Sequence, residues 1–152
     1  MKRVFCRVWL KSLLICLGFI WVTVCAAAAQ ERVCVTASIA NMRSGPSTKS
    51  DQLWQVEKYH PLIIIEKKGK WRKVKDFEGD TAWVHNSLLG KSPCVITVKT
   101  KCNVRSKASI KGKKLFTTER GVPFKVLDRK NGWIKVQHKD GDVGWISKKL
   151  VW

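Results

Sequence analysis

The chain has 152 residues, with 30 Lys and Arg side chains against 11 Asp and Glu, which gives a formal net charge of +19. A charge of this sign and size attracts polyanions in a salt-dependent way, although a well-solvated lysine surface would have the same composition. The histidines and cysteines are scattered without the paired spacing of zinc ligands, so the sequence argues against a metal site, and no cofactor is expected.

Residues 1–29 have the order of a secretory signal peptide. Four basic residues come first, an uncharged and largely apolar stretch follows over 12–25, and alanines fill positions 26–29. We therefore predict export and cleavage near Ala29. The apolar stretch is shorter than the roughly 20 residues that a membrane-spanning helix needs, which makes an uncleaved anchor the weaker alternative. We expect the mature protein to be periplasmic or secreted, with no transmembrane span.

The positive charge is concentrated in the second half of the mature chain. Residues 30–91 carry 11 basic against 7 acidic side chains, whereas residues 92–152 carry 15 against 4. In the cytosol, such a half would indicate nucleic acid as the partner. Outside the inner membrane the abundant polyanions are envelope polymers, anionic lipids and lipopolysaccharide. The predicted export therefore favours anionic envelope surfaces over nucleic acid.

The mature chain contains an internal repeat. A shift of 62 residues aligns 41–90 with 103–152 without a gap and gives 16 identical positions. The matched positions include two tryptophans in each segment, and tryptophan is too rare for chance to explain this. Each unit is only large enough for a marginal hydrophobic core, so we expect the two units to be docked against each other.

We call residues 33–90 copy one and residues 94–152 copy two. Export implies an oxidising compartment, in which a disulfide is expected. Because three cysteines follow the signal peptide, one thiol stays free or pairs between chains. The sequence does not fix the pairing, but we favour a disulfide between Cys34 and Cys94, which both lie at the start of a copy, with Cys102 left over.

Both copies are predicted to be all-β. After the signal peptide no segment has sustained helical periodicity, whereas the apolar run 62–65 is strand-like in length and composition. Pro61 and Pro123 are placed to open strands, where a missing N–H is tolerated. Segments 68–70 and 130–132 are typical of hairpin turns. We expect five or six short strands in each copy, forming a small barrel or sandwich.

Copy two shows a fixed order of motifs. It has Asn-Val-Arg-Ser at 103–106, a Gly-Trp pair opening the strand-like segment 132–136, and a second Gly-Trp pair in 140–146. This order resembles the bacterial SH3-like domain. Copy one departs from it at Lys70 and Ala82, which stand where the family has glycine. The resemblance covers nearly the whole mature chain. It implies small barrels of five to seven strands that serve as targeting or binding modules in envelope proteins, often beside a wall-cutting enzyme domain.

Strand alternation predicts where two of the tryptophans lie. Trp71 shares a strand face with Lys73 while Val74 faces the other way, so the ring is expected on the wetter face. Trp133 and Lys135 are arranged in the same way in copy two. A partly exposed Trp ring can stack on a sugar or grip a peptide. The alternative is that each ring covers a barrel edge.

Further candidate binding residues come from the motifs and from the resemblance, which places Tyr59 near Trp71 as in many SH3-like arrangements. The Asn and Arg residues of the Asn-x-Arg-Ser motifs complete the set, with a role in turns and strand pairing as the alternative. The candidate groove residues are Tyr59, Trp71, Lys73, Trp133, Lys135, Asn41, Arg43, Asn103 and Arg105. We expect Trp83 and Trp145 to be closely packed and the aligned pair Trp54 and Phe116 to fill a core position.

The aligned copies differ most in two places. Tyr59-His60 aligns with Gly121-Val122, and residues 75–78 align with residues 137–140. We interpret these segments as places where the function of the two copies could differ.

The chain shows no catalytic constellation. Its histidines are not repeated between the copies, and two small modules use up the mature length. We therefore predict a non-enzymatic, exported binding or targeting protein for cell-wall peptidoglycan or an envelope protein. One alternative is an adaptor that recognises a peptide through an exposed Trp face. Another is a basic binder of polyanions or nucleic acid, against which the export signal argues.

Overall fold

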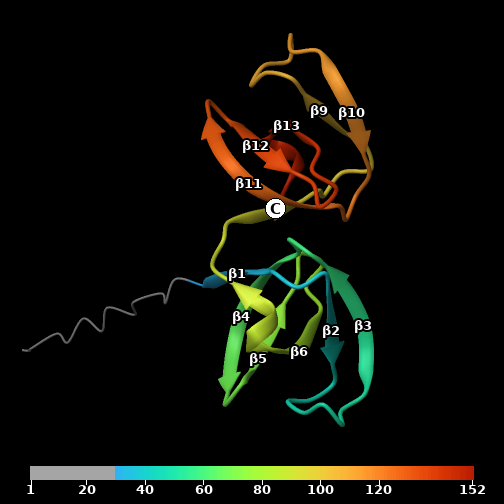
Figure 1. Cartoon of the computed structure of the whole chain (residues 1–152), viewed down its shortest axis with the longest axis vertical. Coiled ribbons are helices and arrows are strands. Elements are labelled where there is room, and N and C mark those ends of the chain that lie inside the picture. Colours follow the sequence, from blue (N-terminus) through green and yellow to red (C-terminus); the bar gives the residue numbers. More distant parts are fainter. Residues whose placement is uncertain (1–29) are drawn as a thin grey trace, which may run out of the picture.

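The computed structural model describes residues 30–152, and the predicted signal peptide, residues 1–29, lies outside the described residues. Each copy forms one antiparallel sheet around its own core, and the two copies stack along the long axis of the molecule (Figure 1). The only helices between residues 30 and 152 are two short 3-10 turns, and neither is long and apolar enough to cross a membrane. The all-β prediction is confirmed.

Copy one is a seven-stranded sheet with the strand order β3-β2-β6-β5-β4-β1-β7. Its strands are β1 (Glu31–Val35), β2 (Ile39–Arg43), β3 (Gln52–Glu57), β4 (Pro61–Lys68), β5 (Trp71–Lys75), β6 (Thr81–His85) and β7 (Leu89–Gly90). The 3-10 turn η1 (Asn86–Leu88) precedes the last strand.

Copy two is a six-stranded sheet with the order β10-β9-β13-β12-β11-β8, which repeats the order of the first six strands of copy one. Its strands are β8 (Cys94–Ile96), β9 (Cys102–Arg105), β10 (Lys114–Thr118), β11 (Pro123–Lys130), β12 (Trp133–Gln137) and β13 (Val143–Ser147). The chain ends after the 3-10 turn η2 (Lys148–Leu150), where Val151 pairs with Thr97. The sequence repeat is therefore a repeat of topology.

The hairpin turns lie where the sequence predicts them. Pro61 and Pro123 are the first residues of β4 and β11. The β4–β5 turn has Gly69 at φ 53°, and the β11–β12 turn has Asn131 at 47° and Gly132 at 77°. Successive positive φ values match the right-handed twist of the flanking strands, and Asn-Gly adopts them at low cost. These turns bring Trp71 and Trp133 to the first position of the returning strand.

Each sheet encloses a separate apolar core. The core of copy one consists of Val33, Val35, Ala40, Met42, Val56, Leu62, Val74, Ala82 and Val84. The core of copy two consists of Val95, Cys102, Val104, Phe124, Val126, Ile134, Val136 and Ile146. Trp54 and Phe116, which the repeat aligns, pack against their respective cores, as expected for a position that needs bulk. Neither copy depends on the other to complete its core.

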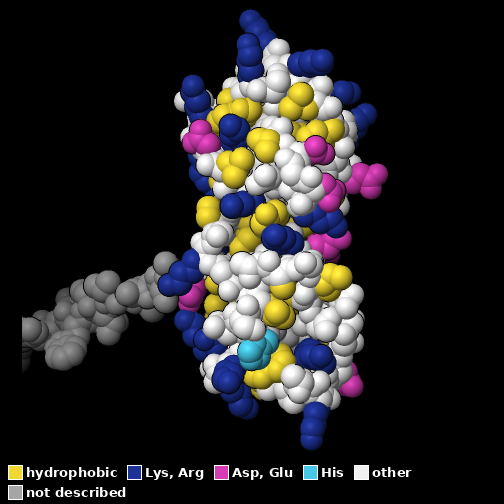
Figure 2. Space-filling model, viewed as in Figure 1, with side chains coloured by type: hydrophobic (Ala, Val, Ile, Leu, Met, Phe, Trp, Pro, Cys, Tyr) yellow, Lys and Arg dark blue, Asp and Glu magenta, His cyan; other side chains and the backbone are white. Residues whose placement is uncertain are grey.

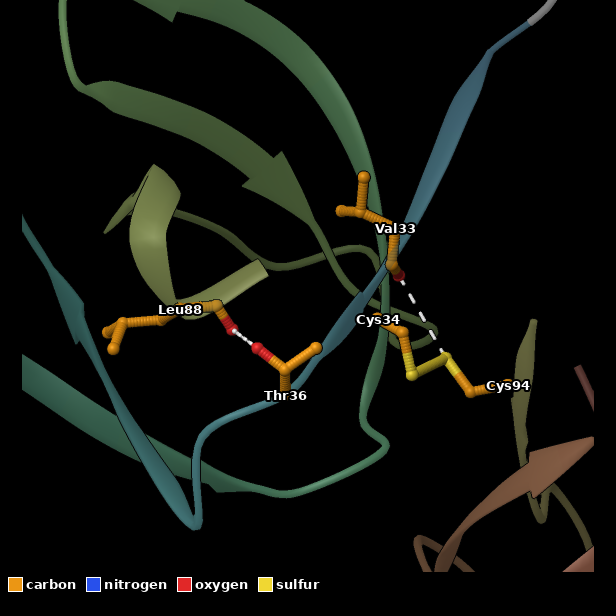
Figure 3. Close-up of a disulfide and its surroundings, with 5 residues drawn as sticks. All are labelled: Val33, Cys34, Thr36, Leu88 and Cys94. Atoms are coloured by element: carbon orange, nitrogen blue, oxygen red, sulfur yellow. Dashed lines mark hydrogen bonds between the residues drawn. A yellow bond between two sulfur atoms is a disulfide. The ribbon is translucent and has the colours of Figure 1, made fainter. Parts of the chain in front are cut away.

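A disulfide joins the first strand of copy one to the first strand of copy two (Figure 3). Cys34 of β1 is bonded to Cys94 of β8, the pair favoured from the sequence, with their Cα atoms 6.0 Å apart. Cys94 Sγ lies 4.0 Å from the carbonyl oxygen of Val33. Beside it, the Thr36 hydroxyl donates a hydrogen bond of 3.2 Å to the carbonyl oxygen of Leu88, which holds the end of copy one against its beginning.

Charged and aromatic side chains also bridge the two copies. Arg120, in the β10–β11 turn of copy two, donates to Glu78 Oε1 at 2.9 Å and places its guanidinium 5.1 Å from the ring centre of Phe77. Lys139, in the β12–β13 turn, donates to Glu57 Oε1 at 2.8 Å. All four charged side chains are partly exposed, so the two ion pairs add little stability and mainly orient the copies.

Candidate binding site on the outer sheet faces

The outer face of the copy-one sheet carries Trp71 beside several other predicted binding residues. In the β5–β6 pairing, Trp71 lies opposite His85 and Lys73 lies opposite Trp83. The β2–β6 pairing places Arg43 opposite Trp83 as well. Residues directly opposite each other point to the same side of a sheet, and the intervening residues of β2 and β6 are buried in the core. These side chains therefore form one row on the solvent side.

Copy two repeats this row. Trp133 lies opposite Ser147, and Lys135 lies opposite Trp145 in the β12–β13 pairing. Arg105 of β9 lies opposite Trp145. Burial along β12 alternates, with the tryptophan and lysine partly exposed and the residues between them buried. The structure thus places Trp133 and Lys135 on the wetter face, where strand alternation predicts them.

The two motif arginines hold the loop that follows their strand. Arg43 Nη1 donates to the carbonyl oxygen of Ser50 at 2.8 Å, and Arg105 Nη1 donates to that of Gly112 at 2.9 Å. Each bond spans the loop between β2 and β3 or between β9 and β10. Because their guanidinium groups are used in this way, the arginines position the loops beside the tryptophan row.

The two motif asparagines link neighbouring strands. Asn41 Oδ1 accepts from Gln55 Nε2 at 2.8 Å, and Asn103 Oδ1 accepts from the Thr117 hydroxyl at 3.1 Å. These bonds join β2 to β3 and β9 to β10 across the sheet surface. The asparagines therefore match the alternative role in strand pairing more closely than a role in ligand contact.

Trp71 and Trp133 have different surroundings. The Trp71 ring meets His85 edge-on, with ring centres 5.3 Å apart and planes at 86°, and His85 Nδ1 lies 2.7 Å from the Ser87 hydroxyl oxygen. In copy two, Ser147 takes the place of His85, and its smaller side chain leaves room beside Trp133. A hollow of about 680 Å³ opens there.

The hollow beside Trp133 combines an aromatic ring, an apolar side chain and positive charge. Its lining includes Ile110, which is 78% exposed, together with Lys148 and Lys149 of η2. Asn131 and Gly132 of the hairpin turn also line it. An exposed aliphatic side chain next to a half-buried Trp and two lysines suits a ligand with both apolar and anionic or hydroxyl groups.

The structure does not bring Tyr59 to Trp71, as the resemblance to other SH3-like arrangements implied. Tyr59 lies in the β3–β4 turn with φ 70° and carries the Lys58 ammonium 5.3 Å from its ring centre. Trp71 pairs with Lys68 at the far end of β4, so the eight-residue strand separates the two aromatic rings. Tyr59 takes a left-handed conformation in the turn before β4, whereas Trp71 follows the other end of that strand.

Trp83 and Trp145 differ in burial. Trp83 is 8% exposed, as expected for close packing, whereas Trp145 is only partly buried. Both belong to the outer row rather than to the cores, because each lies between an arginine and a lysine on the solvent side. Their small predecessors, Ala82 and Gly144, are the residues that face inward. Sequence reasoning missed these two rings as members of the candidate site.

Positive charge surrounds both copies. Figure 2 shows Lys and Arg side chains projecting from both ends of the molecule and along its sides, with fewer acidic side chains between them. Within residues 30–152, no group of three or more His, Cys, Asp or Glu side chains is placed to hold a metal ion. The described surface is thus mainly cationic, and its exposed large hydrophobic side chains are aliphatic.

The family model of the bacterial SH3 domain matches residues 36–91 and 98–152. The chain belongs to the bacterial SH3 domain family. The two matched segments correspond to the two structural copies, so the described chain is a tandem pair of bacterial SH3 domains, referred to below as domain one and domain two. Lys70 and Ala82 of domain one are variations within the family fold.

Among curated proteins, the chain is similar to the putative N-acetylmuramoyl-L-alanine amidase YrvJ of Bacillus subtilis (strain 168). The two are 24% identical over 144 residues, covering 83% of this chain and 27% of that protein. The chain thus spans about a quarter of the length of the curated relative that it matches.

Among solved structures, the chain is similar to NlpC2 from Trichomonas vaginalis at 13% identity and a TM-score of 0.36, covering 82% of this chain and 48% of that one. It is also similar to an NlpC/P60 family protein from Bacillus cereus ATCC 10987 at 16% identity and a TM-score of 0.39, covering 80% of this chain and 55% of that one.

Proposed function

We propose that the protein is an exported, non-enzymatic binding module of the bacterial envelope, with cell-wall peptidoglycan as its first-choice ligand. The observation that carries the proposal is the outer row of each SH3 domain, in which a half-buried tryptophan lies among lysines. A sugar ring or a short peptide can stack on such a ring, and the flanking ammonium groups attract carboxylates.

The relative and the signal-like N-terminal segment support an envelope location. The matched relative is named as a putative N-acetylmuramoyl-L-alanine amidase, and the match covers about a quarter of it. We infer that the shared part serves attachment rather than bond cleavage. Residues 1–29, with basic residues followed by an apolar stretch and alanines, would deliver the domains to the same compartment.

The chemistry of the described residues favours binding over catalysis. Cys102 is fully buried, and its thiol donates to the carbonyl oxygen of Lys99 at 3.4 Å. Burial raises the pKa of this thiol, which keeps it protonated and a poor nucleophile. His60 is also buried, and burial lowers its pKa, with its Nε2 atom left without a hydrogen-bond partner in the described structure. His60 lines a hollow of about 230 Å³ together with Glu57, Asp76 and Glu78, but the described lining of that hollow includes no Ser, Thr, Cys or Lys side chain that could act as a nucleophile.

Retention on purified, insoluble peptidoglycan tests the proposal. The protein should co-sediment at about 150 mM salt, where surface charges more than about 8 Å apart are largely screened. Trp133→Ala should lower retention roughly tenfold, because loss of a central aromatic contact is worth about 1–2 kcal/mol. Trp71→Ala should lower it less, since His85 already covers one edge of that ring.

Lys113→Gln is the matched control for charge, because Lys113 is exposed in the β9–β10 loop and lies outside the outer row. Its retention should equal that of the wild type. No retention of the wild type, or equal retention of all four proteins, would remove peptidoglycan as the ligand. Trp133-dependent capture of an envelope protein in the same extract would instead favour the peptide-adaptor alternative.

A further inference from the structure

A second cleft, of about 580 Å³, lies where the two SH3 domains meet. Strand β1 and the linker of residues 91–93 contribute one side, and β8, the β11–β12 hairpin and the C-terminal Trp152 contribute the other. The half-cystine Cys94 is part of the lining, so the inter-domain disulfide fixes the two sides relative to each other. Trp71 and Trp133 of the outer rows take no part in it, whereas Lys148 lines both this cleft and the hollow beside Trp133.

Unpaired positive charge lines this cleft. No lining residue is acidic, and the four cationic ones are Arg32, Lys91, Arg129 and Lys148. None of the four forms an ion pair with a carboxylate in the part of the chain that the structure describes. Glu31, next to the cleft in sequence, forms its ion pair with Lys67 at 2.6 Å, and Lys67, with a smaller contribution from Lys91, lowers the pKa of this carboxyl. Like charges around one water-filled space repel each other, and an anionic ligand relieves that repulsion.

The cleft is apolar between its cations. Its apolar lining consists of Val33, Pro61, Pro93, Val95, Ile134, Val151 and Trp152. The Arg32 guanidinium lies 4.1 Å from the ring centre of Trp152, and the backbone of Trp152 exchanges two hydrogen bonds with Ile96, of 2.9 and 3.2 Å. The aromatic wall and one of the charges are thereby held in place. Hydrophobic side chains flanked by Lys or Arg are visible at the waist of the molecule in Figure 2.

An open strand edge borders the same cleft. Strand β4 pairs with β1 along Glu31–Cys34, whereas β7 pairs only with Cys34 and Val35. On the β7 side, Glu31 to Val33 have no strand partner among the described residues, but Cys94 Sγ lies 4.0 Å from the carbonyl oxygen of Val33, so the free edge that borders the cleft is at Arg32. An extended peptide can add to such an edge through its backbone, with alternate side chains facing the wall. A phosphate polymer would use neither the edge nor the apolar wall.

We propose that the inter-domain cleft is a second binding site, which takes a short, extended, acidic peptide. The peptide backbone meets the open edge of β1 at Arg32, its apolar side chains face Trp152, Pro61 and Pro93, and its carboxylates meet Arg32, Lys91 and Arg129. This site goes beyond the proposed peptidoglycan contact of the outer rows. It shares Lys148 with the hollow beside Trp133, but Lys91 and Arg129 line only the inter-domain cleft, so variants of these two residues separate the two sites.

Isothermal titration calorimetry on the disulfide-bonded protein at about 150 mM salt tests this site. The probe is a tetrapeptide of alternating valine and glutamate with a free carboxyl terminus, and its partner is the same peptide with glutamine and an amidated end. The acidic peptide should bind at least roughly tenfold more tightly than the neutral one. Arg129→Gln and Lys91→Gln, both at exposed side chains, should each weaken its binding several-fold to roughly tenfold.

Two matched variants distinguish the cleft from the rest of the cationic surface and from the outer row. Lys113→Gln removes the same charge from domain two outside the cleft, and Trp133→Ala removes the ring that borders the hollow of the outer row. Both variants should bind the acidic peptide within twofold of wild type (about 0.4 kcal/mol). The proposal is overturned if the acidic peptide does not bind, if the neutral peptide binds equally, or if Lys113→Gln weakens binding as much as Arg129→Gln. Full displacement of the peptide by inorganic polyphosphate at equal charge would overturn it as well, since a phosphate polymer would then be the occupant.

Discussion

Removing the disulfide should destabilise domain one far more than domain two. The bond joins Cys34 to Cys94, 60 residues apart, and so closes a loop that contains nearly all of domain one and only the first residue of β8 from domain two. For a loop of this length, the restriction of the unfolded chain is worth about 4 kcal/mol at 25 °C. We expect Cys34→Ser/Cys94→Ser to lower the free energy of unfolding of domain one by up to that amount. Domain two, which lies outside the loop, should lose less than about 1 kcal/mol through weaker docking.

Hydrogen exchange in increasing urea, read peptide by peptide, reports the two domains separately. Protection of β4 and β5 should collapse at lower urea in the double variant, whereas protection of β11 and β12 should be nearly unchanged. Reduction of the wild-type protein should reproduce the result, which separates loss of the bond from effects of the serines. An equal loss in both domains, or no loss in domain one, would refute the loop-closure reasoning.

Two further predictions concern single residues. Because burial lowers the pKa of His60, the unfolded chain takes up a proton that the folded imidazole resists, so stability of domain one should fall as pH drops below about 6.5. In urea titrations between pH 7 and pH 5, His60→Val should remove this fall in the free energy of unfolding, and the control His85→Gln should keep it. If His60→Val shows the same pH dependence as the wild type, His60 is not the cause. A Cβ at Gly144 would collide with Val104 Cγ1. Gly144→Ala should therefore lower the free energy of unfolding of domain two by about 1–3 kcal/mol, measured by urea titration at pH 7. Unchanged stability would contradict this, because it would show that the neighbouring strands move apart at little cost.

The fold could be predicted because the same local signals occur twice. Pro61 and Pro123 each open a long strand, and Gly69 and Asn131-Gly132 each make the turn that follows. Gly and Asn-Gly favour the positive φ values that tight hairpin turns require, so the position of such a turn can be predicted from the local sequence alone. The alternation that put Trp133 and Lys135 on one face also follows from backbone geometry alone.

The differences between the copies could not be interpreted from the sequence alone. Residues 59–60 and 75–78, together with their counterparts in copy two, are where the copies differ most, and the sequence favoured a ligand as the reason. The structure places Phe77, Glu78 and Lys139 of these segments at the junction, where they meet Arg120 and Glu57 of the other domain. Such contacts depend on how two folded units dock, which no local pattern encodes. The inter-domain cleft was missed for the same reason.

The junction is made by equivalent turns of the two domains, and this explains why the aligned turn residues differ between the two copies. Glu57, at the β3–β4 turn of domain one, pairs with Lys139 in the β12–β13 turn of domain two. Glu78, in the β5–β6 turn of domain one, pairs with Arg120 in the β10–β11 turn of domain two. Because β3–β4 is equivalent to β10–β11 and β5–β6 to β12–β13, the contacts are arranged as in a two-fold interface. Lys139 of domain two aligns with Phe77 of domain one. If two copies of domain one docked in the same way, Glu57 would therefore face Phe77 and would have no cationic partner there. The divergent turns therefore favour domain one against domain two. Exposed ion pairs contribute little stability, so their role is to orient the two domains. The Cys34–Cys94 disulfide then holds the oriented domains together covalently.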